Sequence, residues 1–345
     1  MIKERIIVRI FNRSIHCAQL FTGLHLLSRK GLISTVLEDH THDEKYPYKT
    51  AIAEIVYRGK VVAFDMLDGY NNIEAIKWFY NNSVFYFKRS FSKKLNDLYG
   101  LDENRVFPWG FNYHVSYVGN PCEGPLVSVI KELSKICLAK ETNSYFCKRV
   151  FEEIPLYKTN DIKILFYSRL WLPSDSLSDD LNCERERINS QRIELVRKLK
   201  EAFSDCFHGG VEASNLAKTI APDICLPSIE TSRREYLIKM HKSDICIATT
   251  GLHNSIGWKM GEYVAAAKGI VSEPLFYEVP GQFNKGINYL EFSSVEECIE
   301  SVRFLHDNPD RLYAMKCHNY DYYRSYLEPA VMMLNSIKIV NEQSS

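Results

Sequence analysis

Residues 244–274 limit most strongly what this chain can fold into, because the hydrophobic periodicity changes twice within them. The short apolar run from Ile245 to Ala248 is typical of a buried parallel strand. Apolar residues then recur at helical spacing from Met260 onward, with Ser255 as the expected N-cap. Gly269 is expected to close this helix before a second strand. The stretch therefore predicts one strand-helix-strand (βαβ) unit.

The loop and first helical turn of such a unit lie at the carboxyl edge of a parallel sheet, where open α/β folds bind ligands. Backbone N–H groups of Ser255, Ile256 and Gly257 would face an anion there, and the helix dipole would favour a phosphate. Glu262 lies further into the helix, and its carboxylate can accept two hydrogen bonds from vicinal hydroxyls. A nucleotide sugar carries both a phosphate and a diol, so these two features together predict a nucleotide-sugar site. The alternative is that Glu262 only complements the helix dipole.

Residues 255–271 resemble the donor-binding segment of GT-B glycosyltransferases, in which a Gly, a short apolar run, a Glu, small residues and another Gly precede a strand. In that family the Glu holds the ribose of the sugar nucleotide, and Glu262 matches its position. Many retaining members carry a further Glu where this chain has Asn254, so retention and inversion both stay open. The resemblance covers most of the chain in its order of elements. It implies an α/β fold of two Rossmann-like, doubly wound parallel-sheet domains that face an interdomain cleft.

The domain boundary is expected near Pro155, before a polar stretch and a new strand. This gives an acceptor-binding domain of residues 1–155 and a nucleotide-sugar-binding domain of residues 156–345. A chain of 345 residues with 46% hydrophobic residues can build two cores. The resemblance also implies that a terminal helix at about 329–342 packs back on the first domain. Residues 125–145 are expected to be helical.

The first strand of the second domain leads into Arg169. GT-B enzymes carry an Arg at this junction to neutralise the donor diphosphate, often with a Lys a few residues on, for which this chain has no clear counterpart. A guanidinium binds phosphate bidentately, which agrees with this role, and the alternative is a surface Arg after a strand. Ser228 lies in a loop where the family often holds the base, and His253 suits the leaving phosphate or the donor sugar. The expected donor-binding set is Arg169, Ser228, His253, Asn254, Ser255, Ile256, Gly257, Lys259 and Glu262.

Two carboxylates follow a buried strand of the first domain. The apolar run from Val61 to Phe64 ends in Asp65 and Asp68, and Gly69 permits a tight turn at the sheet edge. If the enzyme inverts, Asp68 is the predicted catalytic base and Asp65 the second candidate. The alternative is an ordinary turn, which Asp before Gly often forms.

Lys88 and Arg89 end the next apolar strand, and we expect them to bind a phosphate of the acceptor. Simple solvation of a strand end is the alternative. Trp109 would stack on a sugar face, or else pack in the core. Asn12 and Arg13, which follow the first strand, complete the expected acceptor-binding set. These cations suit the phosphates of a lipid-linked saccharide acceptor. Such an acceptor would bring the protein to the inner membrane surface as a peripherally bound protein.

Charge and composition exclude several classes of protein. Lys plus Arg and Asp plus Glu both number 43, which argues against nucleic acid as a partner. No window approaches the ~18 apolar residues of a membrane span, so we expect a cytoplasmic protein. The chain has no Asp-x-Asp triplet, which favours a metal-free mechanism with a nucleotide-diphosphate sugar as donor and no cofactor. His40, Asp43 and Glu44 lack the spacing of metal ligands.

The expected function is sugar transfer from the nucleotide donor to a glycan or lipid-linked acceptor. A sugar-nucleotide epimerase or hydrolase of the same fold and a catalytically silent GT-B-like subunit remain as alternatives. A nicotinamide dehydrogenase is disfavoured, because Phe11-Asn12-Arg13-Ser14 follows the first strand where a Gly-x-Gly-x-x-Gly would stand.

Overall fold

The computed structural model describes residues 4–123 and 146–343, so the helix expected at 125–145 lies outside the described residues. The chain divides into two compact units. The first unit comprises Met1–Val150, Phe276–Gln282 and Tyr322–Ser345, and the second comprises Phe151–Leu275 and Phe283–Asp321. The first unit therefore includes a loop from the middle of the second half of the chain as well as the C-terminal segment.

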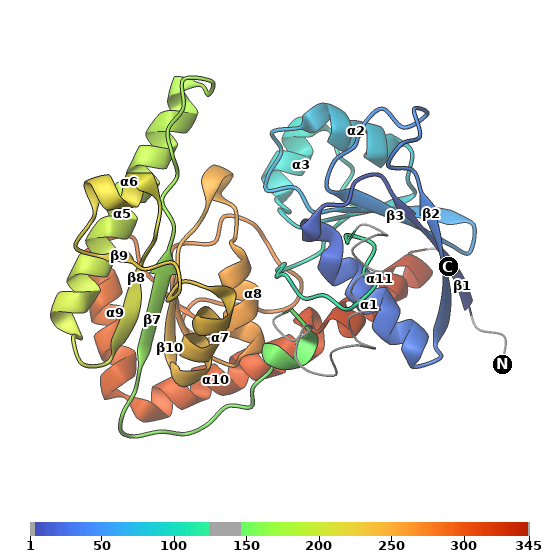
Figure 1. The fold of residues 1–345 in the computed structure, drawn as a ribbon. Helices are drawn as coiled ribbons and strands as arrows, with labels where there is room; N and C mark the ends of the chain where they lie inside the picture. Colours follow the sequence, from blue (N-terminus) through green and yellow to red (C-terminus); the bar gives the residue numbers. More distant parts are fainter. Residues whose placement is uncertain (1–3, 124–145, 344–345) are drawn as a thin grey trace, which may run out of the picture. The chain divides into compact units, whose positions relative to one another are not determined.

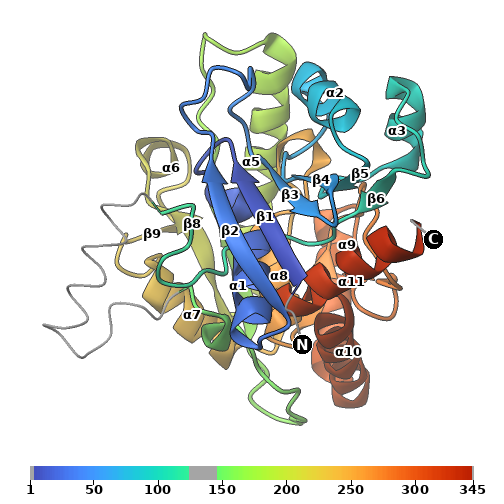
Figure 2. The ribbon, with the colours of Figure 1, turned by 90° about the vertical axis from the view of Figure 1, so that its right-hand side faces the viewer.

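The first unit is built on a six-stranded sheet in the order β2-β1-β3-β4-β5-β6 (Figure 2). β3 runs antiparallel to β1 and β4, and all other neighbours are parallel. With β3 set aside, the order matches the flavodoxin-like 2-1-3-4-5 arrangement. A hairpin joins β3 to β4: Arg58 and Gly59 both have positive φ, as a two-residue type I′ turn requires. The strands are β1 (Glu4–Ile10), β2 (Ile33–Asp39), β3 (Ile52–Tyr57), β4 (Lys60–Asp65), β5 (Phe85–Lys88) and β6 (Val106–Pro108).

Helices cover both faces of this sheet (Figure 1). The helices α1 (Ala18–Arg29) and α11 (Pro329–Glu342) lie on one face, and α2 (Ile73–Asn81) and α3 (Lys93–Tyr99) lie on the other. α1 and α11 approach each other closely at Gly23, where a Cβ atom would lie 2.3 Å from the carbonyl oxygen of Pro329. Short helices η1 (Ile15–Cys17), η2 (Lys148–Val150) and the π-helix η4 (Tyr323–Leu327) complete the described elements of this unit.

The second unit is built on a six-stranded parallel sheet in the order β12-β11-β10-β7-β8-β9. Counted within the unit, this is the strand order 6-5-4-1-2-3 of the Rossmann fold. The short strand β9 directly precedes the loop that contains Ser228. The strands are β7 (Ile164–Ser168), β8 (Phe207–Glu212), β9 (Cys225–Leu226), β10 (Ile245–Ala248), β11 (Gly269–Ser272) and β12 (Leu290–Glu291).

The second sheet is also covered on both faces (Figure 1), and its core is formed by apolar side chains of alternate strand positions. The helices α5 (Asp179–Ala202) and α9 (Val295–Asp307) pack on one face, and α7 (Arg233–Lys242) and α8 (Trp258–Ala265) on the other. α6 (Asn215–Ile220), α10 (Pro309–Tyr322) and the short 3-10 helix η3 (Leu252–Asn254) complete the described elements of this unit. Within the described parts of the chain, no helix has both the length and the apolar character to span a bilayer.

The predicted βαβ unit is confirmed as β10, α8 and β11, but both ends of its helix differ from the prediction. Gly257, and not Ser255, is the N-cap, so α8 begins at Trp258. The helix ends before Gly269, with Ala267 in a left-handed conformation (φ 49°). Gly269 has a packing role instead, because a Cβ atom there would lie 2.2 Å from the Leu312 side chain.

Candidate functional site

The topological switch point of the second sheet lies between β7 and β10. From β7 the chain continues outward to β8, and from β10 it continues in the opposite direction to β11. The loops that leave these two strands therefore diverge at the carboxyl edge, which is where open α/β sheets bind ligands. Arg169 follows β7 at this edge, and Thr249 and Thr250 follow β10.

Arg192 of α5 ties these two loops to each other. Its guanidinium donates to the carbonyl oxygens of Arg169 (2.8 Å) and Thr250 (3.1 Å), and its Nε lies 3.3 Å from the Thr249 hydroxyl. Glu273, which follows β11, accepts from the N–H (2.5 Å) and the hydroxyl (3.0 Å) of Thr250. Burial lowers the pKa of Arg192 to about 10, and the charge of Glu273 opposes this effect. The loops at the switch point are thus held in place by buried polar side chains.

The outer parts of both loops are also fastened to α5. Asn189 donates to the carbonyl of Trp171 and accepts from its N–H, each at 2.8 Å. Glu184 accepts from the N–H of His253 at 2.8 Å. α5 therefore positions both loops of the switch point along its N-terminal half, a role that its charged sequence alone did not indicate.

Cationic side chains gather at this edge. Arg169 is exposed, and its guanidinium lies 4.4 Å from the centre of the Trp171 ring. Lys259, in the first turn of α8, donates to the carbonyl of Tyr167. Burial and then the neighbouring charge of Arg192 lower the pKa of Lys259 to about 8. An anion bound here would relieve the mutual repulsion of these cations.

The loop between β10 and α8 is tightly wound. His253 and Asn254 both have left-handed φ values, 60° and 55°, which are uncommon for residues with a side chain and collect in functional loops. The N–H of Ser255 donates to the carbonyl of Leu252 at 3.1 Å. That N–H is therefore used within the loop, while the anion contacts of Ile256 and Gly257 stay predictions.

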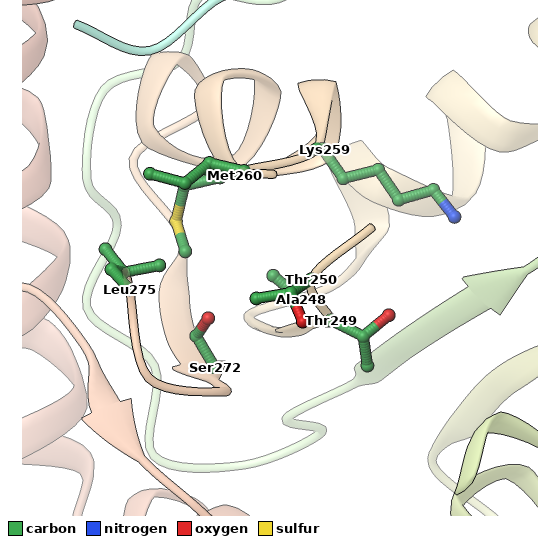
Figure 3. Close-up of a pocket in the computed structure, with 9 residues that line it drawn as sticks. Ala248, Thr249, Thr250, Lys259, Met260, Ser272 and Leu275 are labelled. Atoms are coloured by element: carbon green, nitrogen blue, oxygen red, sulfur yellow. The ribbon is translucent and has the colours of Figure 1, made fainter. Parts of the chain in front are cut away.

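A small pocket lies between the ends of β10 and β11 and the start of α8 (Figure 3), with a volume of about 10 Å³. Met260, Ser272 and Leu275 project toward this space, whereas the side chain of Lys259 extends away from it (Figure 3). The volume suffices for a water-sized group only, so a larger ligand would lie against the mouth of the pocket. The lining residues are Ala248, Thr249, Thr250, Ile256, Gly257, Lys259, Met260, Ser272 and Leu275.

Glu262 is buried on α8 and already has partners. It accepts a hydrogen bond from the Tyr236 hydroxyl (2.6 Å) and pairs with the Arg233 guanidinium (2.9 Å), both on α7. The Glu262 side chain is 2% exposed, and that of Arg233 is 25% exposed. A ligand would therefore reach the carboxylate only after a movement of Arg233 or Tyr236. Ser228 lies exposed between β9 and α7.

In the first unit, Asn12 and Arg13 fasten the loop after β1 to other loops. Asn12 donates to the carbonyl of Lys49 at 2.8 Å. Arg13 donates to the carbonyl of Pro121 at 2.7 Å and pairs with Asp39. Both predicted acceptor residues thus have contacts within the unit.

Trp109 is 2% exposed and lies in the core of the first unit. Its ring meets those of Phe64 and Phe87 edge-on, with centroid distances of 5.0 Å and 6.5 Å. Trp109 therefore packs in the core, which was the alternative to stacking on a sugar face.

Asp65 and Lys88 form an ion pair of 2.6 Å, and both side chains are fully buried. The Tyr86 hydroxyl donates to the same carboxylate at 2.9 Å, and Lys88 also donates to the carbonyl of Gly69 at 2.9 Å. Burial lowers the pKa of Lys88, while the charge of Asp65 opposes this. A ligand could contact either charge only if the pair opened.

Asp68, by contrast, is 47% exposed and pairs with Arg89 at 2.7 Å. The same guanidinium nitrogen lies 3.4 Å from Nδ1 of His16, and Asn112 donates to the His16 carbonyl at 2.7 Å. Burial and then the charge of Arg89 lower the pKa of His16, while Asp68 opposes this. His16 was not among the residues predicted from the sequence. Its position between the first strand and the first helix was the available signal, because that places it at the carboxyl edge of the sheet.

Among residues 4–123 and 146–343, no group of three or more His, Cys, Asp or Glu side chains is arranged to hold a metal ion.

No protein-family model and no curated protein matched this sequence. Several solved structures resemble it in fold. A glycosyltransferase from Rickettsia africae ESF-5 has a TM-score of 0.48 at 11% identity, with 100% of both chains covered. Anabaena Alr3699/HepE in complex with UDP and glucose has a TM-score of 0.48 at 7% identity, with 98% of this chain and 100% of that chain covered. A point mutant of S. aureus TarM, in a complex that includes UDP, has a TM-score of 0.42 at 10% identity, with 78% of this chain and 46% of that chain covered.

Proposed function

We propose that the protein is a glycosyltransferase that transfers a sugar from a nucleotide-diphosphate sugar to an acceptor hydroxyl. The observation that carries this proposal is the gathering of Arg169, Lys259 and the first turn of α8 at the switch point of the second sheet. Glu262 lies on the same helix as Lys259, less than one turn further on. Cations beside a carboxylate suit a ligand that carries both phosphates and a diol.

The diphosphate would bind at the carboxyl edge of β7. Arg169 is exposed and can form two parallel hydrogen bonds with phosphate oxygens. Lys259 adds a point charge, and the start of α8 adds helical N–H groups and the positive end of the dipole. These groups would stabilise the charge that develops on the leaving nucleoside diphosphate.

The ribose would bind at Glu262. Its carboxylate accepts hydrogen bonds, and the Tyr236 and Arg233 donors show that two donors fit around it. Two vicinal hydroxyls would take the place of the Arg233 contact, so donor binding includes a movement of this side chain. We propose that the donor also contacts His253, Asn254 and Ser228.

For an inverting reaction, the acceptor oxygen forms a bond to the anomeric carbon while the bond to the diphosphate oxygen breaks. The acceptor proton passes to a base in the first unit, and the electron pair of the broken bond leaves with the nucleoside diphosphate. Asp68 is the proposed base of the sequence analysis, and the neighbouring His16 is a second candidate, since its lowered pKa keeps the imidazole neutral near pH 7. The acceptor class is a glycan or a lipid-linked saccharide, and the reaction is proposed to need no metal ion.

The first test is calorimetric titration with UDP, GDP, ADP and dTDP and with the matching monophosphates. Arg169→Ala should weaken diphosphate binding by about 1–3 kcal/mol and affect the monophosphate much less, because Arg169 is assigned to the leaving-group charge. Arg197→Ala, which removes an exposed ion pair with Asp223 in the same unit, is the matched control. Equal losses for both ligands would remove Arg169 from the diphosphate site.

The second test measures turnover of the sugar-nucleotide whose nucleotide binds. Release of nucleoside diphosphate that depends on a saccharide acceptor supports transfer. Release without an acceptor would favour a hydrolase, conversion of the sugar nucleotide would favour an epimerase, and binding without turnover would favour a silent subunit. Failure to bind any nucleotide would overturn the proposal.

A further inference from the structure

The loop after β4, residues 66–69, is held by three consecutive residues at the end of β5. Lys88 donates to the carbonyl of Gly69 at 2.9 Å. The Arg89 guanidinium donates to the carbonyl of Met66 at 3.3 Å, and the Ser90 hydroxyl donates to the carbonyl of Leu67 at 3.0 Å. These three donors reach three different carbonyls of one short loop.

Further bonds fix the same loop at its base. Asp65 accepts from the N–H of Leu67 at 2.8 Å, and the N–H of Met66 donates to the carbonyl of Ala51 at 2.9 Å. The N–H of Arg89 donates to the carbonyl of Asp65 at 2.9 Å, which joins the ends of β4 and β5. Because Lys88, Arg89 and Ser90 are all buried, these bonds are shielded from competition with water.

Asp68 is the exposed side chain that this loop presents. Its carboxylate points to the Arg89 guanidinium at 2.7 Å, and the same nitrogen of Arg89 lies 3.4 Å from Nδ1 of His16. One buried cation therefore sets the position of one carboxylate and one imidazole at the carboxyl edge of the first sheet.

We propose that Lys88, Arg89 and Ser90 form one positioning element that holds loop 66–69 and aligns Asp68 with His16 for proton transfer. This inference rests on the proposed function, in which the acceptor proton goes to one of these two groups. It assigns Lys88 and Arg89 to the alignment of proton-transfer groups and not to contact with the acceptor. Arg89 is the central member, because it contacts the loop, the carboxylate and the imidazole together.

The charge of Arg89 has a measurable effect on the pKa of His16. The charge of Arg89 lowers the pKa of His16, and the charge of Asp68 raises it. Replacement of Arg89 by Met removes the first influence and keeps the second. The His16 imidazole should then hold its proton to a higher pH than in the native protein.

The experiment follows the histidine resonances of the full-length protein by NMR during a pH titration, with His16→Gln to identify the His16 signal. Arg89→Met should move the titration of His16 to higher pH, and Arg89→Lys should largely preserve it. Arg105→Met is the matched control, because Arg105 also donates to three carbonyls, those of Tyr80, Ser83 and Val84, before β5. Arg105→Met should leave the His16 titration unchanged.

Ser90→Ala provides a milder variant that keeps every charge. It should lower kcat about tenfold by loosening the loop, without a change in donor KM or in the His16 titration. An unchanged His16 titration in Arg89→Met, or a kcat of Ser90→Ala equal to that of the native protein, would overturn the inference. A native protein that turns over no sugar nucleotide would instead refute the proposed function, while the titration would still test the contact between Arg89 and His16.

Discussion

Lys259 has an ammonium group whose charge depends on its surroundings. It is half-buried on α8 between the Tyr167 carbonyl and two arginines, Arg192 and Arg169, and its pKa falls to about 8. Near pH 7 it is mostly protonated, and as pH rises through 8 it loses the charge that a diphosphate would use. Its neighbours thus give the proposed anion site a pH limit within the range of ordinary assays.

We expect the affinity for a nucleoside diphosphate to fall by about tenfold between pH 7 and pH 9, because the neutral amine of Lys259 attracts the ligand far less. Calorimetry at both pH values measures this. In Lys259→Arg the guanidinium stays charged, so its affinity should be nearly constant over the same range. A native protein as insensitive to pH as Lys259→Arg would show that Lys259 does not bind the anion.

The buried pair of Asp65 and Lys88 predicts a different behaviour. Lys88→Met leaves the Asp65 carboxylate buried without its cation, which should cost about 3–5 kcal/mol of unfolding free energy. The double variant Asp65→Asn with Lys88→Met removes both charges and should cost less than the single change. Urea denaturation of both variants decides this. A double variant that is no more stable than Lys88→Met would show that the pair is not strongly coupled.

Some residues of the candidate site were predictable from the sequence and others were not. Arg169 and Glu262 could be singled out because each stands at a fixed place in a local pattern of strand, loop and helix. Arg192 and Arg233 could not, because their partners lie far away in the sequence, as Arg192 and Thr250 show. The buried partners of Glu262 and Lys88 were unpredictable for the same physical reason: burial is a property of the fold.

At the scale of elements, strong periodicity made β10, α8 and β11 predictable, whereas short elements were missed. α3 and α6 are one to two turns long, and their caps, Ser92 and Ser214, are residues that also favour loops. In the first unit, α1 and α11 pack closely against each other. This packing depends on Gly23, since Pro329 occupies the space that a side chain would need.

Gly23→Ala should lower the unfolding free energy of the first unit by about 1–3 kcal/mol. Its Cβ atom would lie 2.3 Å from the Pro329 carbonyl oxygen and 2.7 Å from the Met333 side chain, so the two helices must separate. Ser28→Ala on the same helix adds no atoms and should change stability by less than ~0.5 kcal/mol. Thermal unfolding of both variants gives the comparison. A Gly23→Ala variant as stable as Ser28→Ala would contradict the close packing of α1 and α11.

At the scale of the whole molecule, the first unit is assembled from segments that are far apart in the chain. The segment Phe276–Gln282 joins it through a β-bridge between Phe91 and Glu278 and a hydrogen bond of 2.9 Å from the Tyr322 hydroxyl to the Pro280 carbonyl. The C-terminal segment adds the buried side chains of η4 and α11. The family resemblance implied a terminal helix on the first domain, but no local pattern could assign the loop at 276–282 to the first unit.

This assembly predicts that the two units respond differently to truncation after Asp321. Among the described residues, truncation removes seven buried side chains of the hydrophobic core, those of Tyr322, Tyr323, Leu327, Ala330, Met332, Met333 and Val340. At about 1.5–3 kcal/mol for each of the larger ones, the loss is comparable with the whole stability of a typical domain. The first unit should therefore unfold, whereas the second keeps all the segments of its own fold.

Hydrogen exchange measured by mass spectrometry tests this prediction, because it reports on each unit separately. In the truncated chain, peptides that contain β1 and β4 should lose their protection, and peptides that contain β7 and β10 should keep theirs. Leu334→Ala in the full-length chain removes a side chain of α11 that is 41% exposed, and it should leave both sets protected. Retained protection of β1 and β4 after truncation would mean that the first sheet is stable without α11. Loss of protection in β7 and β10 as well would mean that the second unit depends on the first for its stability.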